Sequence, residues 1–199
     1  MSQLIEYTNK HVTSTSAHDR RALVVDKMKS ITDSGANCFS CTGVCCTFVG
    51  NSMMVTPIEA LELVYFLNEE GRWNESLLEQ LELTIQIYRL DRPVPGDGRR
   101  SFARRRYTCP FFSEGKKGGC SVRKRYKPYG CLGFNSISSG VKDGENCKSY
   151  LETLEERDEK NSSTEESLNE KIKRELGLDW DKKNMPTALK ELYLMSSIS

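Results

Sequence analysis

The sequence predicts an α+β fold that is mostly helical, with a cysteine-rich metal-binding core, a small β-hairpin and a helical C-terminal extension. Apolar residues recur at helical spacing before and after the middle of the chain, which predicts the helices. All eight cysteines lie within residues 38–147, and charged helical sequence without cysteine follows from Tyr150. We therefore expect a cysteine-cluster metal-binding domain over residues 1–149 and a helical extension over residues 150–199.

The first predicted helix leads into the first cysteines. The first fifteen residues have the character of a polar lead-in. Ser16, with Asp19 three residues later, can cap a helix. Val24, Met28 and Ile31 then recur at the spacing of one buried face. The sequence therefore predicts a helix that begins near Ser16.

Two further helices are predicted before the middle of the chain. Thr56 can cap the first of them, Pro57 suits its first position, and Glu59 can complete a capping box. The apolar stripe of this helix consists of Ile58, Leu61, Val64, Tyr65 and Leu67. Such a wide stripe predicts a position deep in the core. The second helix is expected over residues 75–89.

The middle of the chain predicts loops and one hairpin. Residues 91–98 are rich in Pro and Gly, so they indicate a loop. Residues 107–112 have strand composition, and residues 114–119 are typical of a turn. The return strand would begin near Cys120. Residues 130–144, rich in Gly and Ser, are expected to be irregular.

The C-terminal extension is expected to contain three helices. Leu151 and Leu154 belong to the first, and Ser162 can cap the second, which Gly177 would end. Pro186 lies in the first turn of the last helix.

Global charge does not point to a partner, because 29 basic and 28 acidic side chains nearly cancel. No apolar run resembles a secretory signal or is long enough to cross a bilayer, so we expect no membrane association and a cytoplasmic location. Cytosolic thiols are kept reduced, which favours metal ligation. The even number of cysteines leaves four disulfides as the alternative.

The cysteines have the spacing of metal ligands. Cys38 and Cys41 form a C-x-x-C pair, which can turn both sulfurs toward one point. Thiolates are soft ligands that suit zinc, iron and iron–sulfur clusters. The predicted metal ligands are all eight cysteines: Cys38, Cys41, Cys45, Cys46, Cys109, Cys120, Cys131 and Cys147. They could fill two zinc sites with four thiolates each, or one iron–sulfur cluster with thiols to spare.

The later cysteines stand in three short motifs. These are Cys109-Pro110-Phe111-Phe112, Gly119-Cys120-Ser121-Val122 and Lys127-Pro128-Tyr129-Gly130-Cys131. Together with the opening cysteines, they resemble the bacterial zinc- or iron-chelating cysteine-cluster family (CxxCxxCC) over about residues 38–147. Arg123 stands where that family has Tyr, and Leu132 stands where it has Arg. These departures spare the thiols but change the polar groups near them.

The resemblance implies a metal site formed by the cysteines. Flagellin lysine N-methylases share the cysteine pattern, so the resemblance also implies that such a cluster can serve catalysis. We therefore expect a protein that chelates zinc or iron, the latter also as an iron–sulfur cluster. Two alternatives stay open: a cluster-dependent protein-modifying or redox enzyme, and a metal-stabilised nucleic-acid-binding module. No Ser-His-Asp or Cys-His arrangement is readable, since His11 and His18 precede every cysteine.

Residues 99–127 form a strongly basic segment, with eleven Lys or Arg and one acid, Glu114. Such a segment suits phosphate contacts, with aromatic side chains available for base stacking. These aromatic residues are Phe102, Tyr107, Tyr126 and Tyr129. The segment is a candidate surface for a protein or nucleic-acid partner. Alternatively, its basic side chains offset the negative charge of nearby thiolates.

Overall fold

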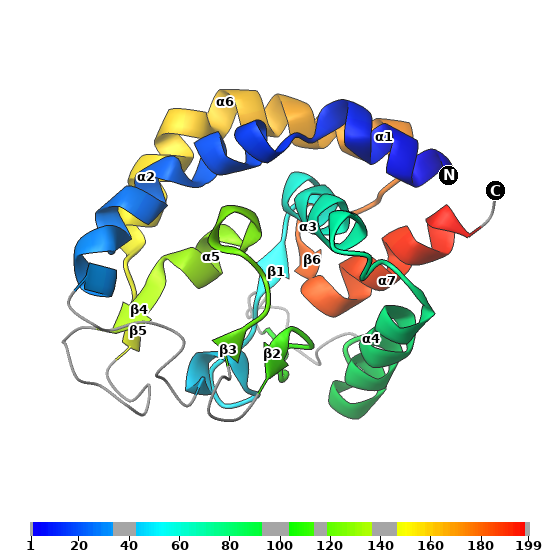
Figure 1. The fold of residues 1–199 in the computed structure, drawn as a ribbon, viewed down its shortest axis with the longest axis horizontal. Coiled ribbons are helices and arrows are strands. Elements are labelled where there is room, and N and C mark those ends of the chain that lie inside the picture. The colour runs from blue at the N-terminus through cyan, green and yellow to red at the C-terminus, as the bar shows by residue number, and fades with distance from the viewer. Residues whose placement is uncertain (1, 34–42, 93–103, 114–118, 137–146, 198–199) are drawn as a thin grey trace, which may run out of the picture.

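The structure is a computed structural model that describes residues 2–33, 43–92, 104–113, 119–136 and 147–197. Helices dominate this part of the chain, and its short strands form three two-stranded antiparallel pairs (Figure 1). The prediction of a mostly helical α+β fold is therefore confirmed. Within the described ranges, no helix is both long and apolar enough to span a membrane.

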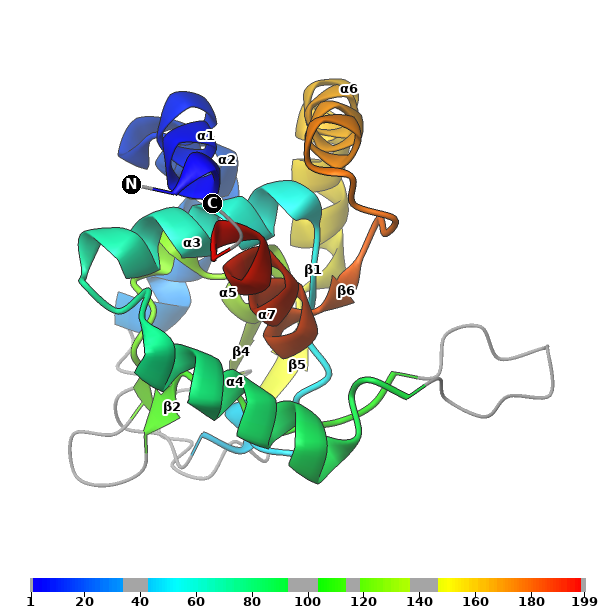
Figure 2. The ribbon, with the colours of Figure 1, turned by 90° about the vertical axis from the view of Figure 1, so that its right-hand side faces the viewer.

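The helices form two levels. Helices α1 (Gln3–His11) and α2 (Ser14–Asp33) run end to end beside the long helix α6 (Leu151–Leu176). Figure 2 shows these two columns standing above helix α3 (Pro57–Glu69). Helices α4 (Glu75–Tyr88) and α7 (Met185–Ser196) pack against each other below α3. The main hydrophobic core lies where α1, α3, α4, α6 and α7 meet.

Helix α1 occupies the segment that was expected to be a polar lead-in, so that prediction is wrong. The Ser2 side chain accepts a hydrogen bond from the Ile5 N–H and caps the helix, while Leu4 and Ile5 are buried. The helix is only nine residues long, and so few apolar positions give a weak periodic signal. Helix α2 begins two residues before the predicted start. There the Thr13 N–H donates a hydrogen bond to the Ser16 hydroxyl, and the Ser16 N–H donates one to the Thr13 hydroxyl.

Helix α3 confirms the predicted capping box. The Thr56 hydroxyl accepts from the Glu59 N–H, and the Glu59 carboxylate accepts from the Thr56 N–H at 2.9 Å. Its apolar stripe is buried, apart from the half-buried Tyr65. Because α3 is surrounded by helices on several sides, it is the central element of the core.

The C-terminal region differs from the prediction in one respect. Helix α6 is one continuous helix of 26 residues rather than two. Ser162 does not start a helix, because its hydroxyl donates to the Glu159 carbonyl inside α6. No Gly or Pro interrupts the sequence before Gly177, which ends the helix in the left-handed conformation as expected.

Residues 150–199 pack onto the rest of the chain. Ile172, Trp180 and Leu189 belong to the same hydrophobic cluster as Leu61. Strand β6 (Lys183–Asn184) pairs antiparallel with strand β1 (Met54–Val55). The division of the chain after residue 149 stays a prediction.

Short elements carry the cysteine region. Strands β2 (Phe112–Ser113) and β3 (Gly119–Cys120) form the predicted hairpin, although its first strand is shorter than expected. The interpretation of residues 130–144 as irregular is wrong for their first part, which contains the end of helix α5 (Tyr129–Leu132) and strand β4 (Phe134–Ser136). Strand β4 pairs with β5 (Cys147–Ser149). The loop predicted over residues 91–98 begins in a turn at residues 91–92, and its remainder lies outside the described residues.

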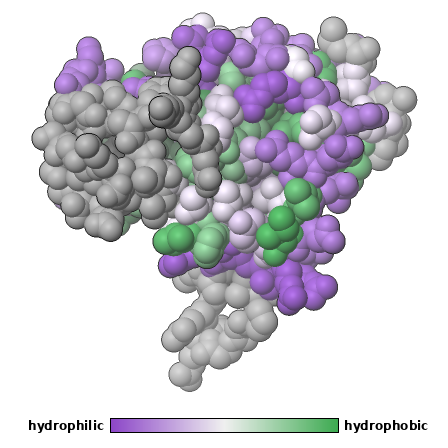
Figure 3. All heavy atoms as spheres, turned by 60° about the horizontal axis from the view of Figure 1, so that its bottom comes forward, coloured by the Kyte–Doolittle hydropathy of each residue, from purple (hydrophilic) through white to green (hydrophobic). Residues whose placement is uncertain are grey.

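One face of the molecule exposes apolar side chains (Figure 3). Phe48 and Val49 follow the short 3-10 helix η1 (Val44–Cys46), and Leu83 and Ile87 lie on α4; all four are exposed. The rings of Phe48 and Tyr88 are 6.5 Å apart, which brings the segment after η1 against the end of α4.

A buried charge network joins the two levels of helices. Arg21 on α2 forms an ion pair of 2.6 Å with Glu62 on α3, and neither side chain is accessible to solvent. Arg157 on α6 pairs with Glu165. The guanidinium carbons of Arg21 and Arg157 lie 4.8 and 3.4 Å from the centre of the Tyr129 ring on α5. The packing of four helices thus depends on charged side chains that are shielded from water and interact with one another instead.

Glu62→Gln removes the carboxylate that faces Arg20 and Arg21, so a buried guanidinium loses its counter-charge. We expect the free energy of unfolding to fall by about 3–5 kcal/mol, as when one partner of a buried pair is removed. Urea unfolding followed by circular dichroism measures this change. The control is Glu69→Gln at an exposed position of the same helix, for which we expect a change below about 0.5 kcal/mol. A loss below about 1 kcal/mol for Glu62→Gln would contradict this account.

Candidate metal centre

The structure describes six of the eight predicted ligands. Cys45 and Cys46 lie in η1, Cys109 precedes β2, Cys120 lies in β3, and Cys131 lies in α5. Cys147 begins β5, where it lies opposite Ser136. Each of these six cysteines is a free thiol. Cys38 and Cys41 lie outside the described residues.

Backbone hydrogen bonds hold the Cys46 and Cys109 segments together. The Cys109 N–H donates to the Cys46 carbonyl at 2.7 Å. Next to this bond, the Phe48 N–H donates to the Thr108 hydroxyl, and the Tyr107 N–H donates to the Asn51 carbonyl at 3.0 Å. Segments that are about sixty residues apart in sequence therefore run side by side.

The hairpin brings a third segment to the same place. The Cys109 carbonyl accepts from the Phe112 N–H at 3.1 Å, which forms the turn into β2. The strand register then sets Phe112 opposite Cys120. The Phe112 ring also covers Gly43, since a Cβ on this glycine would lie 2.1 Å from the ring. Gly43 has a φ of +74°, a conformation that glycine adopts readily. The turn before Cys45 thus packs against the hairpin.

Four sulfurs influence one another electrostatically. The pKa of Cys109 is raised to about 12, mainly by burial and to a smaller extent by the charges of Cys120 and Cys45. Burial also raises the pKa of Cys131, with contributions from Cys109, Cys120 and Cys45. Such influence requires proximity, because charge interactions weaken with distance. These four thiols therefore share one region.

Lys127 faces this region with a positive charge. It lowers the pKa of Cys45, Cys109 and Cys131, against the effect of burial and of the other sulfurs. Lys127 is thus a basic residue of the 99–127 segment that offsets thiolate charge. The sequence interpretation allowed for this role but did not single out Lys127. Nothing in its spacing distinguishes it from the neighbouring Lys and Arg.

Cys45 and Cys46 also lie close together, with their sulfurs 3.9 Å apart. The contact between the two thiols is the largest cause that raises the pKa of Cys45. Cys131 is accessible to solvent, although protein surrounds it closely enough that burial raises its pKa.

Within the described ranges, no group of three or more His, Cys, Asp or Glu side chains is placed to hold a metal ion. The four sulfurs share a region without occupying the positions of ligands around one point. The prediction of a metal-binding core therefore stays a prediction. This finding does not cover Cys38 and Cys41, two of the predicted ligands, because they lie outside the described residues.

The expectation that tyrosines of the basic segment are available for base stacking is wrong. Tyr107, Tyr126 and Tyr129 are only 0%, 5% and 7% exposed. Phe102 lies outside the described residues. Three of the four aromatic residues thus belong to the protein interior, and their spacing in the sequence could not show which way they face.

Several basic side chains of this segment bind the protein itself. Arg106 donates to the Val49 carbonyl, and Arg125 donates to the Ser14 hydroxyl, both at 2.8 Å. Arg123 forms an ion pair with Glu70 at 2.6 Å. These contacts support a structural role for part of the segment.

No protein-family model matches the chain, and neither does any curated protein or solved structure. The resemblance to the zinc- or iron-chelating cysteine-cluster family therefore stays a prediction, based on the cysteine motifs.

Gly43→Ala tests how the opening turn is seated on the hairpin. The left-handed φ and the contact with Phe112 should together lower the free energy of unfolding by about 2–4 kcal/mol. Urea unfolding measures the loss. Gly71→Ala is the matched control, because Gly71 has a φ of +65° but no atom within 4 Å of the added Cβ. It should lose only about 1–2 kcal/mol. Equal losses for the two variants would contradict the packing of Phe112 on Gly43.

Proposed function

We propose that this protein binds zinc or iron through clustered cysteine thiolates, with iron bound either as an ion or as an iron–sulfur cluster. One observation carries the proposal: the backbone bond between Cys109 and Cys46 and the hairpin register bring cysteine-bearing segments together, and the pKa shifts of Cys109 and Cys131 agree with this proximity. Soft thiolate ligands gathered in this way suit zinc and iron.

The electrostatics of the region favour a bound cation. Burial and mutual repulsion raise the pKa of Cys109 and Cys131, so these thiols hold their protons at neutral pH. A metal ion replaces those protons and removes the repulsion, because its positive charge is shared by the sulfurs. Cys131 is exposed, so solvent reaches this residue.

Cys109, Cys120 and Cys131 are the central ligands in this proposal, with Cys45 or Cys46 as the fourth. Cys38, Cys41 and Cys147 would complete a second site or additional positions of a cluster. A site closed by four thiolates contributes folding free energy in a region of short strands and turns. The metal supplies either this structural crosslink or, if a coordination position stays open, Lewis-acid or redox chemistry.

The two alternatives have less support. The buried tyrosines remove the stacking surface expected of a nucleic-acid-binding module. A cluster-dependent protein-modifying or redox enzyme stays a prediction from the resemblance alone.

Elemental analysis tests the proposal. The full chain, purified without air, should contain on the order of one or more zinc or iron ions per chain. Acid-labile sulfide in step with iron would identify an iron–sulfur cluster. Cys109→Ser and Cys131→Ser should each lose most of the metal, because they remove central ligands.

Ser149→Ala, at an exposed position of β5, is the control and should retain the metal. Circular dichroism checks that each variant keeps its helices. The proposal fails if the wild-type chain contains no zinc or iron, or if both serine variants retain the wild-type amount.

A further inference from the structure

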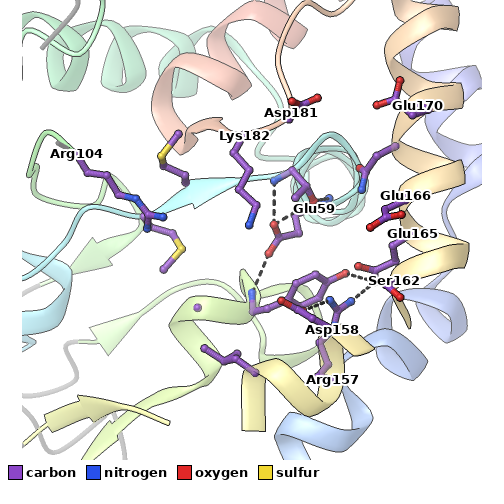
Figure 4. A pocket seen from close by; sticks show the side chains of 17 residues that line it. Glu59, Arg104, Arg157, Asp158, Ser162, Glu165, Glu166, Glu170, Asp181 and Lys182 are labelled. Atoms are coloured by element: carbon purple, nitrogen blue, oxygen red, sulfur yellow. Dashed lines mark hydrogen bonds and ion pairs between the residues drawn. The ribbon is translucent and has the colours of Figure 1, made fainter. Parts of the chain in front are cut away.

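A cavity of about 440 Å³ lies between α6 and the elements that face it, which include Tyr129 and Gly130 of the motif that ends at Cys131 (Figure 4). Strand β1, the first turn of α3 and helix α5 form its other walls. Its size is in the range of cavities that hold small molecules.

The floor of the cavity is polar, and its polar groups already have hydrogen-bond partners within the protein. Glu59 is only 4% exposed. Its carboxylate accepts hydrogen bonds from the N–H of Thr56 and the N–H of Tyr129, each at 2.9 Å. Beside it, Arg157 lies against the Tyr129 ring. These contacts fix the floor in place before any ligand binds, which lowers the entropic cost of binding.

One wall of the cavity is acidic. Asp158, Ser162, Glu166 and Glu170 line it at intervals of four residues along α6. Figure 4 shows these side chains along the same helix, facing the cavity. Asp158 pairs with Arg157 at 2.9 Å, and Glu170 pairs with Lys173 at the same distance. Glu166 has no such partner among the described residues, so its charge is available.

The opposite side of the cavity carries two cations. Figure 4 shows Lys182 reaching into the cavity toward Glu59, and Arg104 entering from the side opposite α6. Neither forms an ion pair with a carboxylate in the ranges that the structure describes. The cavity thus separates unpaired positive charge on one side from unpaired negative charge on the other.

This arrangement favours a ligand that carries both charges over a ligand that carries only one. A ligand that carries only positive charge would leave Arg104 and Lys182 without a counter-charge. Glu59 and Glu166 would repel a ligand that carries only negative charge. A ligand with a negative charge at one end and a positive charge at the other can pair with the cations on one side and with Glu166 on the other.

We propose that the cavity binds a small zwitterion, a free α-amino acid or a short peptide with free termini. Its carboxylate binds Arg104 and Lys182, and its ammonium group binds Glu166. The apolar side chains of Met53, Met54 and Leu154 also line the cavity and receive the aliphatic part of the ligand. None of these contacts requires a metal bound to the cysteines.

Binding of dipeptides to the full chain tests the proposal. The probes are alanyl-alanine, its N-acetyl derivative and its C-terminal amide, titrated into protein labelled with ¹³C at the methionine methyl groups. Alanyl-alanine should shift the signals of Met53 and Met54 saturably. Each capped derivative should bind at least about tenfold more weakly, because it lacks one charge-assisted contact.

Variants locate the two ends of the ligand. Lys182→Met and Glu166→Gln should each weaken the binding of alanyl-alanine about tenfold. Both residues are exposed, so the variants are expected to fold. Lys160→Met, at an exposed position of α6 outside the cavity, is the control and should bind like the wild type.

Three results would overturn the proposal: no saturable shift of either signal with alanyl-alanine, equal binding of the capped derivatives, or equal binding by Lys182→Met and Glu166→Gln.

Discussion

Burial, together with the repulsion that neighbouring thiolates would exert on one another, disfavours negative charge on Cys109 and Cys131. Each of these thiols is influenced by Cys120 and by Cys45. In such a place the sulfurs hold protons or share a cation. Lys127 supplies one positive charge. Metal ligation is the arrangement that neutralises several thiolates at once, and the proposed function follows from this constraint.

The helices determine where the cysteine region sits. Arg21 on α2 donates to the Lys127 carbonyl at 2.7 Å, and Glu59 on α3 accepts from the Tyr129 N–H at 2.9 Å. These two bonds fix the short segment that carries Lys127 and leads to Cys131. The buried charge network thus connects the helical frame with the thiols. The bond between Glu59 and Tyr129 also forms part of the floor of the cavity beside α6, so this one polar interaction supports both proposed sites.

The sequence predicted the elements that depend on local chemistry. The capping box of Thr56 and Glu59, the stop at Gly177 and the hairpin around Cys120 are all confirmed, because their signals lie within a few residues. Helix α1 was missed because only a few apolar residues mark it. The break predicted at Ser162 was wrong because a serine can also bond to a carbonyl within its own helix.

The features that depend on distant contacts could not be predicted. Arg21, Glu62 and Arg157 are charged residues that a single sequence assigns to the surface, yet they are buried together. The C-x-x-C spacing identified cysteines as candidate ligands. It could not show that Lys127 would face the sulfurs, or that the cavity beside α6 would separate opposite charges, since both depend on residues far apart in the chain.

X-ray absorption at the edge of the metal that copurifies with the chain tests the central claim most directly. We expect a first shell made of sulfur, at about 2.3 Å if the metal is zinc. A first shell made only of nitrogen or oxygen, at about 2.0–2.2 Å for zinc, would contradict thiolate ligation.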